Sequence, residues 1–229
     1  SDDDADTEIK VAETLLSRRI DALLVASSLP ADHSYYRTVQ ANGVPVIGLD
    51  RAMDDEIFAC VISEDLDGAY ELTQALLQQD ICSIGLVGAV PDLCISKERE
   101  QGFLAAIEQH GHPVKKLTAY GDHFSQEQGQ AQVQQWIDND TVPDAILATS
   151  YTLFEGVLDC LILNPSLMAT TKLATFGDNR LLDFLPSKIQ SLPQQFELIA
   201  EHALKMALKA VNGRNQPGVE VVSRKIIRR

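Results

Sequence analysis

The chain has 229 residues, of which 45% are hydrophobic and 23% are charged, and its formal net charge is −14. This composition is that of an ordinary globular protein, long enough for one large domain or two small ones. The acidic charge excludes a surface that grips nucleic acid, since the only basic run is SRKIIRR at 223–229, and no apolar run approaches the roughly 20 residues that span a bilayer.

Short apolar runs alternate with helical patterns along the whole chain. The runs predict strands at 21–27, 44–50, 83–89, 144–150, 172–178 and 189–193. They are nearly continuous, as in parallel strands that are covered on both faces. Apolar stripes at helical spacing predict helices over 68–79, 97–110 and 196–211, and Ser125 with Gln128 resembles a capping box that opens a further helix. This alternation predicts an α/β fold built from βαβ units.

Polar or conformationally special residues follow most of the predicted strands. They are Ser27 and Ser28, Asp50 and Arg51, Gly88, Thr149 and Ser150, and Gly177 to Asn179. Ligands of open parallel sheets bind at the carboxyl ends of strands, although turns favour the same residue types. Arg51 and Asp178 are the most informative, because a charge beside a buried strand is costly without a partner.

No catalytic or metal-binding pattern is present. The sequence has no GxxxxGK[ST], GxGxxG, GxSxG or HExxH motif. The four cysteines form no CxxC pair, and the five histidines are not grouped with them at ligand spacing. We therefore expect no enzyme, no metal and no cofactor. The acidic start of the chain, SDDDADTEIK, is no export signal, but a mature exported protein would look the same.

An ordered set of motifs resembles the lactose/galactose repressor family over essentially the whole chain. The motifs are SEDLDGAYELTQALL, SIGLVGAVPDLCISKEREQGFLAAI, GDHFSQEQG, PDAILATSYTLFEGVLDCL and LATFGDNRLLDFL. Two more, DALLVASSLPADHSYY and GLDRAMD, are similar to the fructose-repressor type within that family. The resemblance implies the effector-binding domain of a bacterial transcription repressor, with a periplasmic-binding-protein-like fold of two subdomains. It also implies a phosphorylated fructose as effector, either fructose 1-phosphate or fructose 1,6-bisphosphate, bound in the cleft between the subdomains.

The resemblance assigns two arginines and two serines to the phosphate side of this site. Arg99 in SKEREQGF matches the arginine that holds the effector in relatives, and Arg51 matches the second cation of the fructose type. Ser27 and Ser28 would add hydroxyl donors. A guanidinium group offers a planar fork of donors that matches phosphate oxygens. The alternatives are structural: Arg99 would pair with Glu98 or Glu100 on a solvated helix face, and Arg51 with Asp50, Asp54 or Asp55.

Three further residues are assigned to the sugar. Asp178 in FGDN matches the acid that accepts sugar hydroxyls, Ser150 matches a small polar residue beside the ligand, and Phe124 in GDHF matches an aromatic ring stacked on it. For Phe124 the alternative is ordinary core packing.

The resemblance also predicts the organisation of the molecule. We expect an N-terminal subdomain of 1–62 plus 193–215 and a C-terminal subdomain of 63–192 plus 216–229. The helix-turn-helix headpiece of the family is absent from this sequence, and so are the first strand and helix of the family's N-terminal subdomain. DNA would therefore be bound only through a headpiece outside this sequence. The expected protein is a cytoplasmic homodimer without membrane contact. The alternative is a transport-type sugar-binding protein of the same fold.

Overall fold

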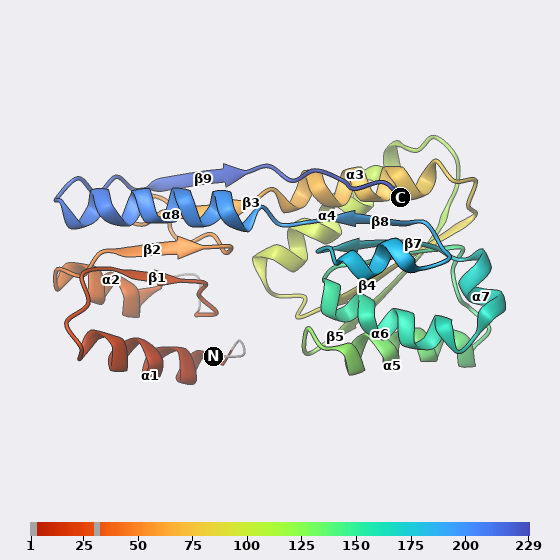
Figure 1. Ribbon diagram of the computed structural model, residues 1–229, viewed down its shortest axis with the longest axis horizontal. Helices are drawn as coiled ribbons and strands as arrows, with labels where there is room; N and C mark the ends of the chain where they lie inside the picture. Colours follow the sequence, from red (N-terminus) through yellow and green to blue (C-terminus); the bar gives the residue numbers. More distant parts are fainter. Residues whose placement is uncertain (1–3, 30–32) are drawn as a thin grey trace. The chain divides into compact units, whose positions relative to one another are not determined.

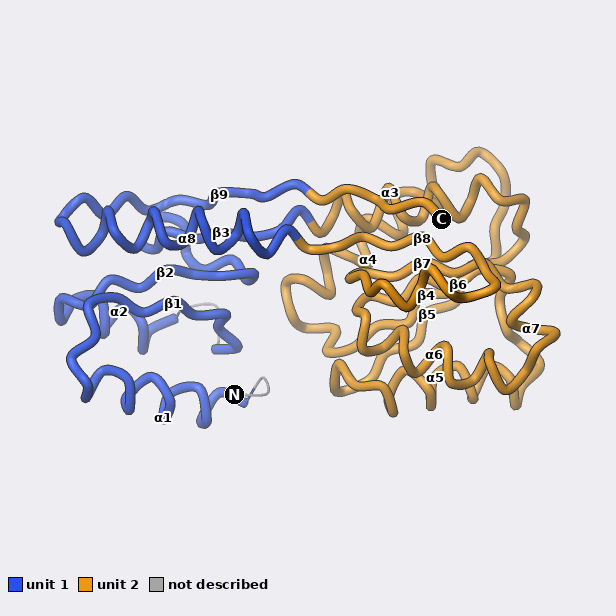
Figure 2. Tube along the Cα trace, in the orientation of Figure 1, with its two compact units in different colours: residues 1–64, 195–223 blue, residues 65–194, 224–229 orange. Residues whose placement is uncertain are grey.

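A computed structural model describes residues 4–29 and 33–229, and it divides into two compact units (Figure 2). Unit 1 comprises Ser1–Glu64 and Gln195–Ser223, and unit 2 comprises Asp65–Gln194 and Arg224–Arg229. The chain therefore passes from one unit to the other three times. Residues 30–32 of the DALLVASSLPADHSYY motif lie outside the described part.

One predicted boundary is wrong. The segment 216–223 was expected in the C-terminal subdomain, but Gly218–Val222 forms a strand that pairs in parallel with Ala59–Ser63 of unit 1. Five backbone-paired positions hold it there, from Ala59 with Gly218 to Ser63 with Val222. Only the last six residues, Arg224–Arg229, join unit 2.

Unit 1 is a four-stranded parallel sheet covered on both faces (Figure 1). Its elements are α1 (Ala5–Leu16), β1 (Leu23–Val25), α2 (Ser34–Ala41), β2 (Val46–Leu49), β3 (Ala59–Ser63), α8 (Phe196–Val211) and β9 (Gly218–Val222), with the strand order β1-β2-β3-β9. Val46 and Cys60 pack against α1 and α2, whereas Ile47 and Ala59 pack against α8. Neighbouring residues of a strand face opposite sides of the sheet. Because helices cover both sides here, both faces of the strands are apolar.

Unit 2 is a five-stranded parallel sheet with the order β5-β4-β6-β7-β8. Its elements are α3 (Asp65–Leu77), β4 (Ser83–Ala89), α4 (Cys94–Gln109), β5 (Lys115–Gly121), α5 (Gln126–Asp138), β6 (Ala145–Ala148), α6 (Tyr151–Ile162), α7 (Pro165–Thr170), β7 (Lys172–Phe176), the 3-10 helix η1 (Arg180–Phe184) and β8 (Ile189–Leu192). Leu86 and Leu147 pack with α3 and α4, and Val87 and Ile146 pack with α5 and α6. The α/β fold of two subdomains with parallel sheets is confirmed.

Glycines let the paired helices of unit 2 approach each other closely. A Cβ atom on Gly102 of α4 would lie 2.1 Å from the carbonyl oxygen of Leu66 in α3. The same holds between α5 and α6, where a Cβ on Gly129 would lie 2.1 Å from the carbonyl oxygen of Leu153. The glycine of the SKEREQGF motif is thus explained by helix packing. In the described part of the chain, no helix is long and apolar enough to cross a membrane.

Candidate functional site

All seven residues that the sequence singles out lie at or near the carboxyl ends of strands. In unit 1, Ser27 and Ser28 follow β1 and Arg51 follows β2. In unit 2, Arg99 lies on α4, the helix after β4, and the others are Phe124 after β5, Ser150 after β6 and Asp178 after β7. Because the strands of each sheet are parallel, these ends gather at one edge of that sheet. Each unit therefore carries its own group of candidate residues.

In unit 1 the two serines bind an internal carboxylate, that of Glu8 on α1. Oε1 of Glu8 accepts from the Ser27 hydroxyl at 2.8 Å and from the Tyr36 hydroxyl at 2.6 Å. Oε2 accepts from the backbone N–H of Ser28 at 2.7 Å and from its hydroxyl at 2.5 Å. Glu8 is only 5% exposed. Burial by itself raises the pKa of this carboxyl group, but the hydrogen bonds from Ser28, Tyr36 and Ser27 outweigh it and hold the pKa below its ordinary value.

We call this carboxylate with its donors from Ser27, Ser28 and Tyr36 the Glu8 cradle. A hydroxyl group has a single proton to donate, and both serine hydroxyls give theirs to Glu8. Their donation to a phosphate stays a prediction, and it requires these protons to change partner. Glu8 was not predicted from the sequence. The signal available was its place one helical turn before Ala12, on the apolar side of α1.

Arg51 ties the loop after β2 to the loop after β1. Its Nη1 donates to the backbone carbonyl of Ser27 at 3.3 Å. Asp50, just before it, has a φ of +60°, which turns the chain sharply at the strand end. Asp54, one of the expected partners of Arg51, forms an ion pair with Arg37. The structure thus brings Arg51 and the two serines together at one edge of unit 1.

In unit 2, Arg99 is a buried group with three kinds of partner. It is 7% exposed, and its Nη1 donates to the carbonyl of Thr149 at 2.6 Å. Its Nη2 lies 3.1 and 3.2 Å from the two carboxylate oxygens of Asp65. The guanidinium carbon lies 4.4 Å from the ring centre of Phe176, a cation–π distance. Arg224 from the C-terminal tail binds the same Asp65 at 2.9 Å.

This arrangement rules out the structural alternative for Arg99 and leaves its predicted contact with the effector open. Arg99 is not on a solvated helix face with Glu98 or Glu100, because the following strands bury it against Phe176. Two buried polar atoms beside it, Nε of Arg99 and Oγ1 of Thr149, have no hydrogen-bond partner among the described residues. Buried polar groups normally have partners, so these two atoms are candidates for contact with water or a ligand.

Ser150 stands at the start of α6, directly after Thr149. Its hydroxyl oxygen accepts from the backbone N–H of Leu153 at 3.2 Å and so caps the helix. Its proton is not used in that bond. Tyr151 follows, and burial together with the negative charges of Glu155 and Asp178 raises the pKa of its hydroxyl group. Tyr151 was not predicted as a site residue, although it directly follows one.

Asp178 is held by two hydrogen bonds to one of its carboxylate oxygens. Its Oδ1 accepts from the Ser191 hydroxyl at 2.6 Å and from Nη2 of Arg229 at 2.7 Å, while Oδ2 takes no part in these bonds. Gly177 has a φ of +81°, and a Cβ there would lie 2.7 Å from the Cβ of Tyr151. The glycine of FGDN therefore permits both the turn and the close approach of Tyr151.

Phe124 is half-buried and packs against the cluster that includes Val133 and Trp136 of α5. Core packing describes this position, and stacking on a ligand stays a prediction. Among the described residues, no three His, Cys, Asp or Glu side chains group to hold a metal ion. All four cysteines are free thiols.

Comparison with known proteins gives a consistent result. Residues 1–164 match the family described as periplasmic binding proteins and sugar binding domain of LacI family. The chain is 55% identical over 226 residues to the fructose operon regulatory protein of Vibrio cholerae, covering 99% of the chain and 69% of that protein. It is 33% identical over 232 residues to the catabolite repressor/activator of Escherichia coli K12, covering 100% of the chain and 69% of that protein. Its structure is similar to the Cra transcriptional dual regulator of Pseudomonas putida in complex with fructose 1-phosphate, with a TM-score of 0.94, 42% identity, and coverage of 100% of the chain and 85% of the other.

Proposed function

The chain belongs to the LacI family of sugar-binding domains and periplasmic binding proteins, and from this premise we propose that it is the effector-sensing part of a fructose-responsive transcription regulator. The observation that carries the proposal is the 55% identity, over 99% of the chain, to a fructose operon regulatory protein. At 42% identity, the regulator from Pseudomonas putida binds fructose 1-phosphate. That protein supports fructose 1-phosphate over the bisphosphate as the effector of this chain.

The effector is held by the candidate residues at the strand ends. In unit 1, Arg51 and the Ser27–Ser28 loop face the phosphate. In unit 2, Arg99 donates through its unpartnered Nε, and Ser150 and Asp178 bind the sugar hydroxyls. Asp178 suits this role because Ser191 and Arg229 occupy Oδ1 and leave Oδ2 for the ligand. Charge-assisted hydrogen bonds of this kind are roughly twice as strong as neutral ones.

The effector acts by favouring one arrangement of the two units. The chain passes between the units three times. A ligand shifts such an equilibrium only by its difference in affinity for the two states. DNA is contacted by a headpiece outside these 229 residues, since a net charge of −14 disfavours contact with the phosphate backbone. As in other transcription regulators, the protein works in the cytoplasm.

The regulator is a homodimer. Exposed apolar side chains support this, namely Leu204, Leu208 and Val211 along α8 and Leu181 and Phe184 on η1. Exposed apolar groups gathered on one element are typical of a contact with another protein. Size-exclusion chromatography with light scattering tests this point, and a monomer at micromolar concentration contradicts it.

Calorimetric titration of the chain with fructose 1-phosphate, fructose 1,6-bisphosphate and fructose tests the proposal. We expect fructose 1-phosphate to bind at least about tenfold more tightly than fructose, because only the phosphate meets the arginines. Arg51→Ala should reduce this preference, whereas Arg37→Ala, which removes a surface ion pair of the same unit, should not. No binding by a folded chain would overturn the proposal. Tight binding of fructose alone would favour a transport-type protein.

A further inference from the structure

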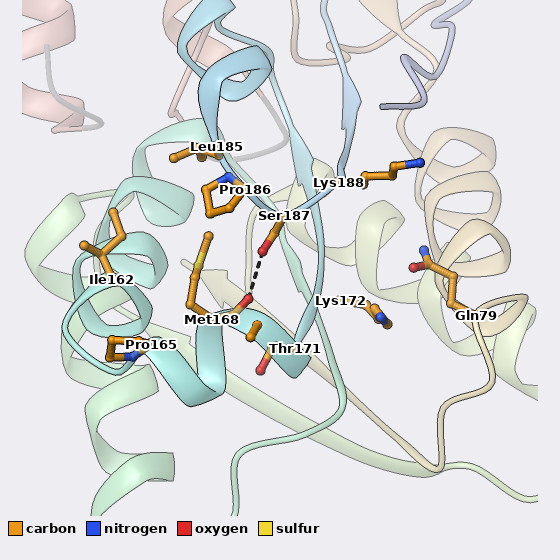
Figure 3. A pocket seen from close by; sticks show the side chains of 11 residues that line it. Gln79, Ile162, Pro165, Met168, Thr171, Lys172, Leu185, Pro186, Ser187 and Lys188 are labelled. Atoms are coloured by element: carbon orange, nitrogen blue, oxygen red, sulfur yellow. Dashed lines mark hydrogen bonds between the residues drawn. The ribbon is translucent and has the colours of Figure 1, made fainter.

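A second groove lies at the opposite end of the unit 2 strands, where β7 and β8 begin (Figure 3). Its cavity has a volume of about 720 Å³, within the range of small-molecule sites. Lys172 is the first residue of β7 and Lys188 precedes β8, whereas Ser150 and Asp178 follow the other ends of the strands. This groove, which we call the amino-edge groove, is thus separate from the candidate effector residues.

The amino-edge groove has an apolar side and a polar side. Figure 3 shows the apolar side chains together, from the end of α6, from α7 and from the segment after η1; they are Ile162, Pro165, Met168, Leu185 and Pro186. Gln79, Lys172 and Lys188 lie on the other side of the same view. A ligand that fills this groove therefore needs an apolar body and a group that binds ammonium.

The polar side continues into a neighbouring cavity of about 330 Å³, which shares Gln79 and Lys188 with the first. It adds Gln190 and Arg228. Gln190 is only 9% exposed, and its side-chain oxygen Oε1 has no hydrogen-bond partner among the described residues. An unsatisfied buried acceptor costs about 1–3 kcal/mol, so this atom points to a missing hydrogen-bond donor, such as a water molecule or the P–OH group of a singly ionised phosphate ester.

The cations along this groove are not neutralised by the protein. Within residues 4–29 and 33–229, Lys172, Lys188 and Arg228 form no ion pair, whereas Arg229 binds Asp178 and Asp183. These three cations make the groove locally positive, although the chain as a whole has a net charge of −14. Charge complementarity selects an anion as the occupant.

We propose that the amino-edge groove binds a small amphipathic anion, with its apolar body against Ile162, Met168 and Leu185 and its charged group at Lys172, Lys188 and Arg228. Neither part of such a ligand is sufficient alone. The apolar side lacks hydrogen-bond donors, and lysines in water attract a simple anion only weakly. The two contributions add when one molecule joins them.

The methionines of the chain give a direct test. There are three, and Met53 and Met206 lie in unit 1 while Met168 lines the groove. In the chain labelled with ¹³C-methyl methionine, octyl phosphate below its micelle concentration should move the Met168 resonance in a saturable way and leave the other two unchanged. Octanol and inorganic phosphate should each bind at least about tenfold more weakly. Octanoate tests which charged group is recognised. If octanoate binds as tightly as octyl phosphate, charge alone is recognised; if it binds more weakly, phosphate is preferred to carboxylate.

Charge reversal supplies the matched control. Lys172→Glu with Lys188→Glu should weaken octyl phosphate about tenfold or more, because two attractive charges become repulsive. Lys115→Glu with Lys116→Glu makes the same change in charge at the start of β5, away from the groove, and should have little effect. An unmoved Met168, simultaneous movement of all three methionines, octanol as tight as octyl phosphate, or equal losses in both double variants would each overturn the proposal.

Discussion

Each unit buries a charged side chain, and the two units stabilise that charge in opposite ways. In unit 1 a buried carboxylate, Glu8, is surrounded by neutral donors from Ser27, Ser28 and Tyr36. In unit 2 a buried guanidinium, that of Arg99, is matched by Asp65 and by the ring of Phe176. A phosphate is negatively charged like Glu8, so in unit 1 it competes with an internal group for the same donors. In unit 2 it joins a cation that is already in place.

Substitution of the internal acid should affect the two units differently. Removing Asp65 leaves two buried arginines without their shared carboxylate, whereas removing Glu8 leaves only neutral groups behind. Breaking a buried ion pair by deleting one partner is strongly destabilising, while unsatisfied neutral donors cost less. The two units should therefore differ in how much stability depends on their internal acid.

Asp65→Ala should have the largest effect. Its side chain is 1% exposed and lies 2.9 Å from Arg224 and 3.1 Å from Arg99. We expect a loss of about 3–5 kcal/mol in the free energy of unfolding, measured by urea denaturation. Asp67→Ala, on the exposed side of the same helix, is the control and should change little. Equal effects of the two substitutions would mean that the buried ion pairs do not stabilise unit 2.

Glu8→Ala should cost less, about 1–3 kcal/mol, because the donors of Ser27, Ser28 and Tyr36 lose their acceptor. Glu13→Ala on the solvent side of α1 serves as the control. If Glu8→Ala matched Asp65→Ala in its cost, the contrast between the two units would be wrong.

Glu8 should also give unit 1 its own pH dependence. The pKa of Glu8 is lowered in the folded chain from its ordinary value of 4.5, so the folded state favours the ionised form. Its contribution is present in full above pH 4.5 and is lost as the pH falls through the lower, folded pKa. The stability difference between the natural chain and Glu8→Gln should thus shrink as the pH falls below 4.5. A difference that stays constant down to pH 3 would contradict the assignment.

The sequence predicts continuous apolar strands better than solvent-exposed ones. All six predicted strands contain an observed one, from β1 to β8, because continuous apolar runs are distinctive. β5 and β9 were missed. Each pairs with a single neighbour at the edge of its sheet, and each is largely solvent-exposed, as the start of β5 at Lys115 and Lys116 illustrates. β3 was missed as well, although its apolar run Ala59–Ser63 is buried.

The candidate site was predicted in part for a related reason. Ser27, Arg51, Ser150 and Asp178 could be found because strand ends can be recognised in sequence. Their internal partners could not, because Glu8 and Arg229 come from other elements of the chain and meet Ser27 and Asp178 only in the folded state. The same holds for Asp65, which pairs with Arg99 and Arg224. The sequence therefore did not reveal the network that fixes each candidate residue, and the contact of these residues with a ligand stays a prediction.

The smallest expected change in stability is at Ser150, where two substitutions distinguish capping of α6 from binding of the sugar phosphate. As the cap of α6, its replacement by Ala should cost about 1 kcal/mol. Ser150→Asp keeps a side-chain acceptor for the N–H of Leu153, so stability should change by less than about 0.5 kcal/mol. Its new negative charge would nevertheless repel a sugar phosphate, and fructose 1-phosphate should bind about tenfold more weakly or worse. If Ser150→Asp bound the sugar phosphate normally, Ser150 would be a helix cap only, and unit 2 would hold the effector through Arg99 and Asp178.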